Sequence, residues 1–438
     1  MKDFIKPATH SIGLLFILLA FASCGSGQSA HSQNDSVSPA SLSTGTTPPA
    51  GDSGTPADPG TPAEPVPATN PTPAATPVSS VPVPAPAPAE GSVPPAEGNG
   101  TSQAPKWQLL GGRVNASQRG VAVWLTLATV QGTPVVAWEE DGKIYAAFWN
   151  GTRWNEEGPL NADPAEAASL PALAADGQGL FLTWIEGRSL HLVRREGSGW
   201  APVAVQSSQS ECGPVNAGLE VRQGVPILAW DSFCSDSRYA STRVQQWAGA
   251  WVDLGGVGEH YADAPSPRKY ALGSNDQNLS LAVLMQNASS EGIELALFHH
   301  AGGSWLPDGG PANDPLTFNP SAFSLAFVQE RPTLAFQQEG IQAKQWNGEA
   351  WVRLGGPLSQ DGVDPALLGV DASPTLAFSG PRVEVWSWNG SQWAQKGTAL
   401  NQIPGSFSWS TALATSGRQL YTAWIENGFV FVKSLATQ

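Results

Sequence analysis

Four acidic residues recur at nearly the same offset behind short apolar segments that end in an aromatic residue. They are Glu140, Glu186, Asp231 and Glu426. A long connection elsewhere carries an unusual mixture of aromatic and basic side chains: His260, Tyr261, Arg268 and Tyr270. Such side chains suit recognition, because Tyr and Arg combine a large contact area with directed hydrogen bonds. We expect the two sets to line one ligand-binding face; the alternative is a solvated acidic rim beside a long surface loop.

Motifs of the common enzyme classes do not occur in the sequence. There is no G-x-S-x-G elbow, HExxH, Walker loop or EF-hand pattern. His299 and His300 are adjacent, so in a strand they would point to opposite faces and form a poor metal chelate. A pair of carboxyl groups at glycosidase spacing cannot be recognised in the sequence alone. We therefore expect a protein that is not an enzyme and that holds no metal or cofactor.

The segments that would position these residues repeat about every 47 residues. The phase is set by Trp107, Trp154, Trp200, Trp251, Trp305, Trp351 and Trp393. Several of these follow a tight turn, as in Trp149-Asn-Gly-Thr-Arg-Trp154, where Asn-Gly accepts positive φ and indicates a hairpin. Upstream lie short β-branched and aromatic segments such as Pro134-Val-Val-Ala-Trp138, which are typical of buried strands.

Four short strands in each of seven repeats predict an all-β fold, a seven-bladed β-propeller over residues 106–438. The last repeat stops after its third strand, whereas Trp107 to Gly112 is an outer strand without a repeat of its own. Pairing the two would close the ring and remove an exposed sheet edge. An array of two-sheet sandwiches is the alternative. We expect the aromatic residues beside the turns, and those at the ends of the short apolar segments, to pack between neighbouring blades.

Two cysteines flank the first two strands of the third repeat. Cys212 precedes the innermost strand, and Cys234 follows the strand that ends near Trp230. In a four-stranded up-and-down blade these two positions lie at the same end, so the sulfurs would meet in an oxidising compartment. We expect a disulfide. Zinc binding is disfavoured, because two cysteines without a nearby histidine fall short of four ligands.

The first 23 residues have the features of a bacterial export signal. Lys2 and Lys6 precede an apolar run of 11 residues, Ile12 to Ala22, which is too short to span a bilayer. The run ends in Ala22-Ser23-Cys24-Gly25, which resembles the lipobox of bacterial lipoproteins, although Phe21 stands where that family prefers Leu. The resemblance implies diacylglycerol on the Cys24 sulfur, a fatty acyl chain such as palmitate on its amine, and an outer-membrane destination. Ordinary cleavage after Ala22 is the alternative.

Residues 24–105 have the composition of a disordered tether. Between residues 25 and 105 there are six acids, no Lys or Arg, and no aromatic residue, while Pro, Ala, Ser, Thr and Gly dominate. Such a segment cannot bury enough apolar surface to offset its ordering entropy. The whole chain has a net charge of −15 and no clustered basic residues, which excludes nucleic acid as an expected partner.

The repeat endings W-N-G-x-x-W and L-G-G resemble those of bacterial lectin-type propellers. In that group, shallow sites between blades hold sugars by aromatic stacking. Sialidases share the propeller architecture, but their S-x-D-x-G-x-T-W turn does not occur in this sequence. We expect a recognition module, tethered to the cell envelope by its lipid, for a glycan or protein ligand. The alternatives are a non-catalytic scaffold subunit of an envelope complex and a sialidase-like or other glycosidase.

Overall fold

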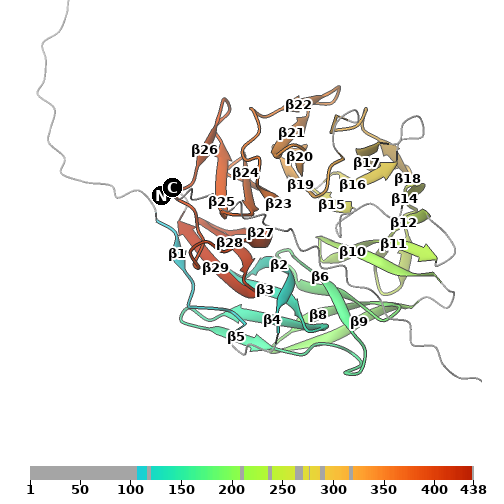
Figure 1. The fold of residues 1–438 in the computed structure, drawn as a ribbon. Coiled ribbons are helices and arrows are strands. Elements are labelled where there is room, and N and C mark those ends of the chain that lie inside the picture. The colour runs from blue at the N-terminus through green and yellow to red at the C-terminus, as the bar shows by residue number, and fades with distance from the viewer. Residues whose placement is uncertain are drawn as a thin grey trace, which may run out of the picture. The chain divides into compact units, whose positions relative to one another are not determined.

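A computed structural model describes residues 106–115, 120–207, 212–234, 239–261, 270–275, 277–286, 292–314 and 319–436. All regular elements in this part are strands, and they form seven antiparallel sheets around a central axis (Figure 1). The fold is the predicted seven-bladed β-propeller, not an array of sandwiches. The predicted signal peptide, Cys24 and the tether lie outside the described residues.

Each blade begins with an inner strand beside the axis and continues outward by hairpins. The inner strands are β2 (Ala122–Val130), β6 (Ala168–Ala175), β10 (Cys212–Arg222), β15 (Tyr270–Ser274), β19 (Phe323–Val328), β23 (Val363–Val370) and β27 (Ser408–Ser416). The second strands are β3 (Thr133–Glu140), β7 (Leu180–Glu186), β11 (Val225–Cys234), β16 (Leu279–Gln286), β20 (Arg331–Gln337), β24 (Ser373–Ser379) and β28 (Gln419–Glu426). We number the blades 1 to 7 in this order.

The two outer positions of each blade hold the remaining strands. The third strands are β4 (Lys143–Trp149), β8 (Ser189–Glu196), β12 (Tyr239–Trp247), β17 (Ile293–Ala301), β21 (Ile341–Trp346), β25 (Glu384–Trp388) and β29 (Phe429–Ala436). The outermost are β5 (Trp154–Glu157), β9 (Gly199–Ser207), β13 (Trp251–Asp253), β18 (Ser304–Pro307), β22 (Trp351–Arg353), β26 (Trp393–Gln395) and β1 (Gln108–Leu109). An additional strand, β14 (Glu259–Tyr261), pairs with the start of β12 and was not predicted.

The ring closes between the first and last strands, as the missing outer strand of the last repeat predicted. Gln108 pairs with Ser434 and Leu109 with Lys433, so β1 becomes the outermost strand of blade 7 (Figure 1). The indole nitrogen of Trp107 also donates a hydrogen bond to the carbonyl oxygen of Lys396 in blade 6, at 2.5 Å. Closure therefore involves both strand pairing and a contact to the neighbouring blade.

The hydrophobic core is divided into seven clusters, and each cluster joins two adjacent blades. The aromatic residues that end the second strands lie inside them: Trp138, Phe336, Phe378 and Trp424 are fully buried. Blades thus stabilise one another through face-to-face packing of sheets, which removes apolar surface from water. The expectation that these aromatics pack between blades is confirmed.

The turn tryptophans also connect neighbouring blades. Trp154 donates its indole hydrogen to the carbonyl of Leu110 at 2.7 Å, and Trp393 donates to that of Leu354 at 2.6 Å. The L-G-G motif belongs to the same contact. Gly355 has φ +70, and a Cβ there would lie 3.1 Å from the ring of Trp388. A glycine is needed because backbone conformation and space both disfavour a side chain.

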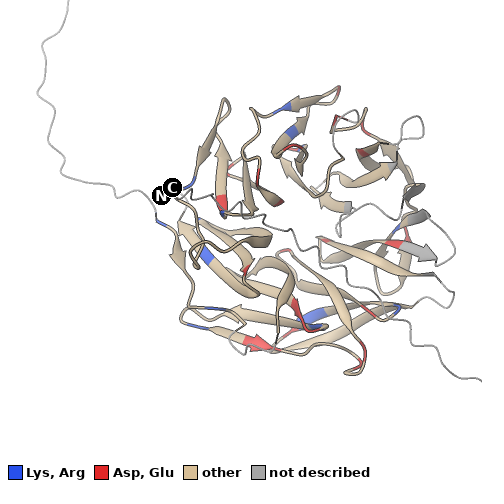
Figure 2. Ribbon diagram, viewed as in Figure 1, with Lys and Arg blue, Asp and Glu red and all other residues tan. Residues whose placement is uncertain are grey.

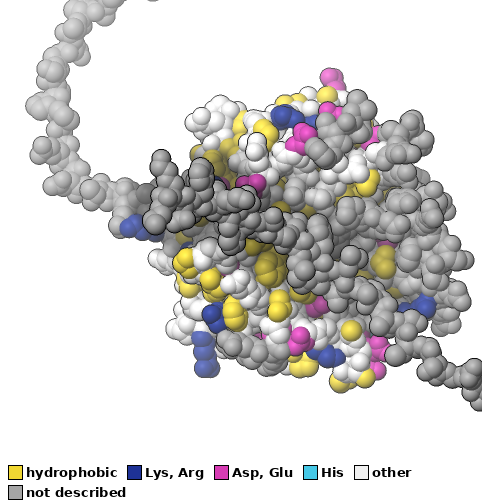
Figure 3. Space-filling model, in the orientation of Figure 1, with side chains coloured by type: hydrophobic (Ala, Val, Ile, Leu, Met, Phe, Trp, Pro, Cys, Tyr) yellow, Lys and Arg dark blue, Asp and Glu magenta, His cyan; other side chains and the backbone are white. Residues whose placement is uncertain are grey.

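Charged side chains are scattered over the blades and form no basic stripe in the described part (Figure 2). On the face in Figure 3, hydrophobic side chains show over the blades that contain β1 to β5 and β27 to β29. Two of the large exposed hydrophobic residues precede inner strands of these blades: Val121 is 56% exposed and Phe407 is 50% exposed. No helix long and apolar enough to cross a membrane occurs among the described residues.

Candidate functional site

The four predicted acidic residues lie inside the fold. Glu140, Asp231 and Glu426 have no exposed surface, and Glu186 is 5% exposed. Glu140, Glu186 and Glu426 each end a second strand, where the connection from the preceding blade folds over the side chain. We expected these side chains on a ligand-binding face or a solvated rim. Because a side chain without exposed surface cannot contact a ligand at the surface, we do not propose them as ligand contacts.

Three of these carboxylates hold the incoming connection in place. Glu186 accepts hydrogen bonds from the backbone N–H of Ala162 at 2.9 Å and of Asp163 at 2.5 Å, and from the Trp184 indole at 2.8 Å. Burial alone would raise the pKa of Glu186, but these hydrogen bonds hold its pKa below the ordinary value of 4.5. The carboxylate is therefore a structural anion.

Glu426 and Glu140 repeat this arrangement in blades 7 and 1. Glu426 accepts from the backbone N–H groups of Gln402 at 2.9 Å and Ile403 at 2.8 Å, and from the Trp424 indole at 2.9 Å. Glu140 accepts from the N–H of Gly120 at 2.9 Å and from the Trp138 indole at 3.0 Å. A Trp two residues before the acid is thus part of the same device.

Asp231 has a different set of partners in blade 3. Asn216 donates to it at 3.3 Å, and Thr242 donates at 3.1 Å. Both distances join side chains of the same blade, so this acid links the inner, second and third strands. The offset of one residue, which distinguished Asp231 in the sequence, accompanies this different role.

The predicted basic and aromatic residues lie in a region that the structure describes only in part. His260 and Tyr261 belong to the backbone of β14, and Tyr270 begins β15. Their side chains, and all of Arg268, lie outside the described residues. β14 pairs with residues 239–241 of β12, which places this connection at the end of blade 3 where the second and third strands meet. A recognition role for these four residues stays a prediction.

The backbone register places the two cysteines opposite each other. Cys212 at the start of β10 is the direct partner of Cys234 at the end of β11. Direct partners in an antiparallel pair have Cα atoms about 4.5–5.5 Å apart, which lies within the range that disulfides span. The two sulfur atoms lie outside the described part, so the disulfide stays a prediction.

The central channel is lined by the inner strands, and its mouth is shaped by β-bulges. The pairing register shifts near the start of β2, β6, β10, β23 and β27. Leu170, Asn216, Asp364 and Ser410 lie in these bulges with φ between 50° and 59°. Such values are unusual for residues other than glycine, and bulges redirect side chains. Here Ser410 accepts a hydrogen bond from the backbone N–H of Leu125 at 2.9 Å, and Asp364 accepts one from that of Ser410 at 2.8 Å, so the bulges connect the inner strands of neighbouring blades.

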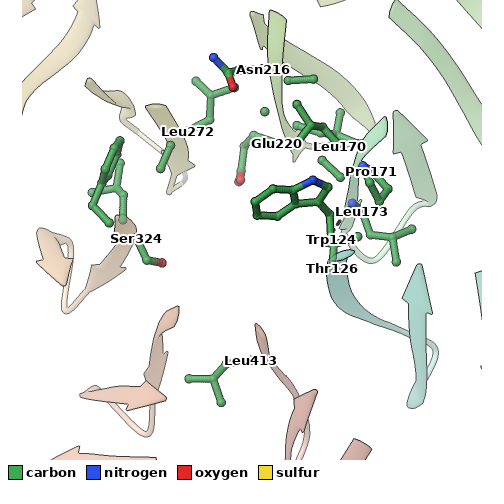
Figure 4. Close-up of a pocket in the computed structure, with 17 residues that line it drawn as sticks. Trp124, Thr126, Leu170, Pro171, Leu173, Asn216, Glu220, Leu272, Ser324 and Leu413 are labelled. Carbon is green, nitrogen blue, oxygen red and sulfur yellow. Dashed lines mark hydrogen bonds between the residues drawn. The ribbon is translucent and has the colours of Figure 1, made fainter. Parts of the chain in front are cut away.

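The channel contains a cavity of about 330 Å³ that is bordered by six of the inner strands. Figure 4 shows the indole of Trp124 projecting from β2 into this cavity, with the Glu220 side chain directed to the same space. Leu170, Leu272 and Leu413 contribute apolar walls (Figure 4). The cavity therefore combines an aromatic face with aliphatic and polar groups.

Trp124 differs from the tryptophans that connect blades. It is half-buried, lies in the bulge of β2, and belongs to none of the seven interblade clusters. Among the described residues, no acceptor lies within hydrogen-bond distance of its indole nitrogen. Trp124 was not among the site residues predicted from the sequence. The sequence does distinguish it, because Trp124 occupies neither the repeat position of the turn tryptophans nor that of the aromatic residues at the ends of the second strands.

Polar groups of the channel lie near its walls and its far end. Thr126 and Ser324 accept hydrogen bonds from the backbone of the next blade, at 3.2 Å from Leu173 and 3.1 Å from Leu367. Glu220 accepts one from the Ser274 hydroxyl at 2.6 Å. Burial raises the pKa of Glu220 to about 7. At neutral pH this carboxyl is partly protonated and can act as donor or acceptor.

A second carboxyl with a raised pKa lies behind the bulge of blade 2. Glu139 accepts a hydrogen bond from the backbone N–H of Leu170 at 3.4 Å, and burial raises its pKa to about 7. Leu170 borders the channel near one end of its strand, whereas Glu220 lies near the opposite end of β10. The two groups therefore do not form an acid pair across one bond.

The described residues contain no group of three or more His, Cys, Asp or Glu side chains that could hold a metal ion. His299 and Asp308 share a hydrogen bond of 2.8 Å between the ring Nδ1 and the carboxyl oxygen. His300 packs against Trp305 instead, with ring centres 5.2 Å apart. The two histidines have separate neighbours, as expected for adjacent residues of a strand.

Comparisons with known proteins give distant structural neighbours and no family. No family model and no curated protein matches the sequence. A sialidase of Trypanosoma rangeli in complex with the inhibitor DANA is 11% identical, with a TM-score of 0.40 over 72% of this chain and 55% of its own. The chain thus spans about half the length of that sialidase.

The fungal lectin of Aleuria aurantia is also similar in structure. A mutant of this lectin in complex with Fucα1-6GlcNAc is 14% identical, with a TM-score of 0.43 over 65% of this chain and 96% of its own. The same lectin is described as a six-bladed β-propeller, so it has one blade fewer. The seven-bladed β-propeller of this chain is shown by its own strand pairing.

Proposed function

We propose that this protein is a recognition propeller of the cell envelope that binds a glycan in its central channel. The observation that carries the proposal is the position of Trp124, whose indole projects into the cavity and serves no interblade cluster (Figure 4). Sugars present flat C–H faces that stack on aromatic rings and hydroxyls that bond to polar side chains. An aromatic face beside small polar groups suits this chemistry.

The size and polarity of the channel favour a glycan over a protein ligand. A cavity of about 330 Å³ lies at the lower end of small-ligand pockets, which span about 300–1,000 Å³. Thr126, Asn216 and Ser324 supply hydroxyl and amide groups, and Glu220 is the one acid among the described residues that line it. A folded protein could insert no more than a single side chain or loop tip.

The test is binding of a glycan array by the full chain, followed by titration of the best ligand. Trp124→Ala should weaken binding about tenfold or more, since it removes the stacking surface. Trp124→Phe keeps a ring and should retain most of the affinity. Trp351→Phe, on the outer rim, is the matched control and should bind as the unmodified protein. Glycan binding that is unchanged in Trp124→Ala would overturn the proposal.

A glycosidase is the second candidate, because Glu220 has the raised pKa of a general acid. The usual mechanism needs a second carboxyl about 5–10 Å away. Asp176 lies near enough to Glu220 to raise its pKa further, but Asp176 is not among the described residues that line the channel, which favours binding over hydrolysis. Release of p-nitrophenol from a panel of aryl glycosides, with loss of this activity in Glu220→Gln, would establish the enzyme instead.

A further inference from the structure

The central channel carries a carboxyl group well below the indole on which a sugar would stack. Trp124 lies six residues before the end of β2, and Glu220 lies two residues before the end of β10. Both strands run from the same mouth of the channel and end at two-residue turns. Glu220 therefore lies four residues deeper, which is about 13 Å along a strand. A ligand that reaches both groups must be longer than a single sugar ring.

The carboxyl group of Glu220 has capacity for further hydrogen bonds. Its Oε1 accepts the Ser274 hydroxyl at 2.6 Å, and its Oε2 has no hydrogen-bond partner among the described residues. A carboxylate offers about four acceptor positions, so the bond to Ser274 leaves most of them open. The side chain is directed into the cavity (Figure 4). Glu220 can therefore accept hydrogen bonds from a ligand without giving up the bond that links blades 3 and 4.

A second acid adds negative potential at this end of the channel. Burial raises the pKa of Glu220 to about 7, and the charge of Asp176 adds to the rise. Asp176 follows β6 and accepts the backbone N–H groups of Gln178 at 2.8 Å, Gly179 at 3.0 Å and Gly224 at 2.5 Å. These bonds fix Asp176 in its turn, so it acts on the cavity through its charge. A cation beside Glu220 would reverse both effects, because an opposite charge favours the ionised carboxylate.

An ammonium group on the ligand would complement this carboxyl. It donates three hydrogen bonds, and its bonds to a carboxylate are about twice as strong as those between neutral groups. Among glycans, an ammonium group belongs to amino sugars that carry no acyl group on nitrogen. We propose that the channel binds an oligosaccharide of free amino sugars, with one ring stacked on Trp124 and an ammonium group on Glu220. The inference rests on the proposed glycan function of the channel and names the class of its ligand.

The test titrates three trisaccharides of the same β-1,4 linkage into the full chain by calorimetry at pH 6. They are built from glucosamine, N-acetylglucosamine and glucose, so the same ring position carries an ammonium, an acetamido or a hydroxyl group. We expect the glucosamine trisaccharide to bind about tenfold tighter or more than the other two, because it alone presents a cation to Glu220. The glucose trisaccharide controls for size, since its hydroxyl replaces the ammonium without added bulk.

Binding of the cation should also release a proton from the protein. At pH 6 a carboxyl with a pKa of about 7 is mostly protonated, and the ammonium group of the ligand favours its ionised form. The heat of binding, measured in two buffers of different ionisation enthalpy, should therefore report release of about one proton for the glucosamine trisaccharide. The glucose trisaccharide should release about none, because it brings no charge to Glu220.

Glu220→Gln removes the charge but keeps an acceptor for the Ser274 hydroxyl. It should weaken binding of the glucosamine trisaccharide about tenfold or more, abolish the proton release and leave the affinity for the glucose trisaccharide unchanged. Glu139→Gln is the matched control. It removes another carboxyl whose pKa is raised to about 7, but Glu139 is not among the described residues that line the channel, so this variant should bind as the unmodified protein. Trp124→Ala should weaken binding of all three trisaccharides.

The two proposals for the channel fail in different ways. If neutral glycans bind through Trp124 and the glucosamine trisaccharide binds no tighter, the channel is a glycan site and the amino-sugar inference is wrong. Equal losses for the charged and the neutral trisaccharides in Glu220→Gln would also overturn the inference, since Glu220 would then act through the fold alone. If no glycan loses affinity in Trp124→Ala, both proposals are wrong.

Discussion

A glutamate two residues after a buried tryptophan anchors the connection between blades three times in the described part of this molecule. In each case the carboxylate accepts the indole hydrogen of that Trp and a backbone N–H of the incoming connection. Blade 5 uses Gln338 at the same position, and its amide both accepts from and donates to the backbone of Asp314. A hydrogen-bond acceptor is therefore common to all four blades at this position, whereas a negative charge is not.

Glu186→Gln tests whether the charge contributes to stability. The folded pKa of Glu186 is lower than 4.5, so its contribution is present above that pH and is lost as the pH falls through the folded pKa. The variant should be less stable by about 1–3 kcal/mol at pH 7. The difference from the unmodified protein should shrink at pH 3. Urea denaturation at the two pH values measures this, and a difference independent of pH would contradict it.

Glu220→Gln should have the opposite dependence on pH. The folded pKa of Glu220 is raised to about 7, so the neutral form is favoured in the folded chain. Glu220 therefore contributes fully to the stability of the fold below pH 4.5, the ordinary pKa, and this contribution is lost as the pH rises through about 7. The amide can still accept the Ser274 hydroxyl. Thermal denaturation should show the variant to be more stable than the unmodified protein at pH 9, with little difference at pH 5.

At this scale the sequence could show that acids recur but not where their side chains point. The offset of Glu140, Glu186 and Glu426 from an aromatic residue is visible in the sequence. Their burial depends on the connection that folds over each of them, whose path no local pattern specifies. Trp124 was missed for a related reason: a bulge in β2 turns it to the axis, and bulges have no simple sequence signature.

Among the elements, β1 is short but closes the ring. It contains two residues, yet it covers the edge of β29 and its neighbour Trp107 reaches blade 6. Deletion of residues 106–113 should lower stability by several kcal/mol out of a typical total of about 5–15. Amide exchange in β29 should accelerate more than exchange in β12. An unchanged melting temperature would show that the ring does not depend on this strand.

The pairing of β10 with β11 leads to a prediction about redox chemistry. Because Cys212 and Cys234 are direct partners in the register, oxidation should link them without a change of backbone. Mass spectrometry of unreduced peptides should detect the 212–234 link in protein from an oxidising compartment. Cys212→Ser and Cys234→Ser should lower the melting temperature by similar amounts, since either removes the same bond. Free thiols at both positions would contradict the prediction.

The strands were largely predictable because each blade repeats the same solution. Asn-Gly turns and the tryptophans that follow them predicted the hairpins, and the first strand without a repeat of its own predicted the closure of the ring. β14 was not predicted, since it adds a strand outside the repeat. In blade 4, His300 lies opposite Trp305 in the register, where blades 1, 5 and 6 place a second Trp. The sequence showed this replacement only as a pair of histidines. A cavity of about 380 Å³ between blades 3 and 4, which His300 borders, could not be predicted without the register of β17 and β18.

For the whole molecule, ring architecture separates two kinds of cavity. The channel is bordered by residues of six blades, so its contents depend on closure of the ring. The cavity between blades 3 and 4 depends on two blades alone. Deletion of β1 should therefore weaken glycan binding in the channel, whereas the cavity between blades 3 and 4 should keep its shape.

Attachment to the membrane is the last prediction. The segment Ala22-Ser23-Cys24 predicts lipidation, and several acyl chains on one residue give stable anchoring where a single chain gives marginal binding. The 81 residues from 25 to 105 would then hold the propeller between about 50 Å from the lipid as a coil and about 250 Å when fully extended. In a bacterial host, the unmodified protein should partition with membranes and into detergent.

Cys24→Ala should remove both the lipid and this partitioning, leaving a soluble or unprocessed form. Ala22→Gly is the matched control, because it keeps a small residue before the cysteine and should still be lipidated. Both variants should give propellers with the same melting temperature, since residue 24 lies outside the seven blades. Normal membrane partitioning of Cys24→Ala would contradict the lipoprotein prediction. It would favour cleavage after Ala22, and the tether would then have no anchor at its first residue.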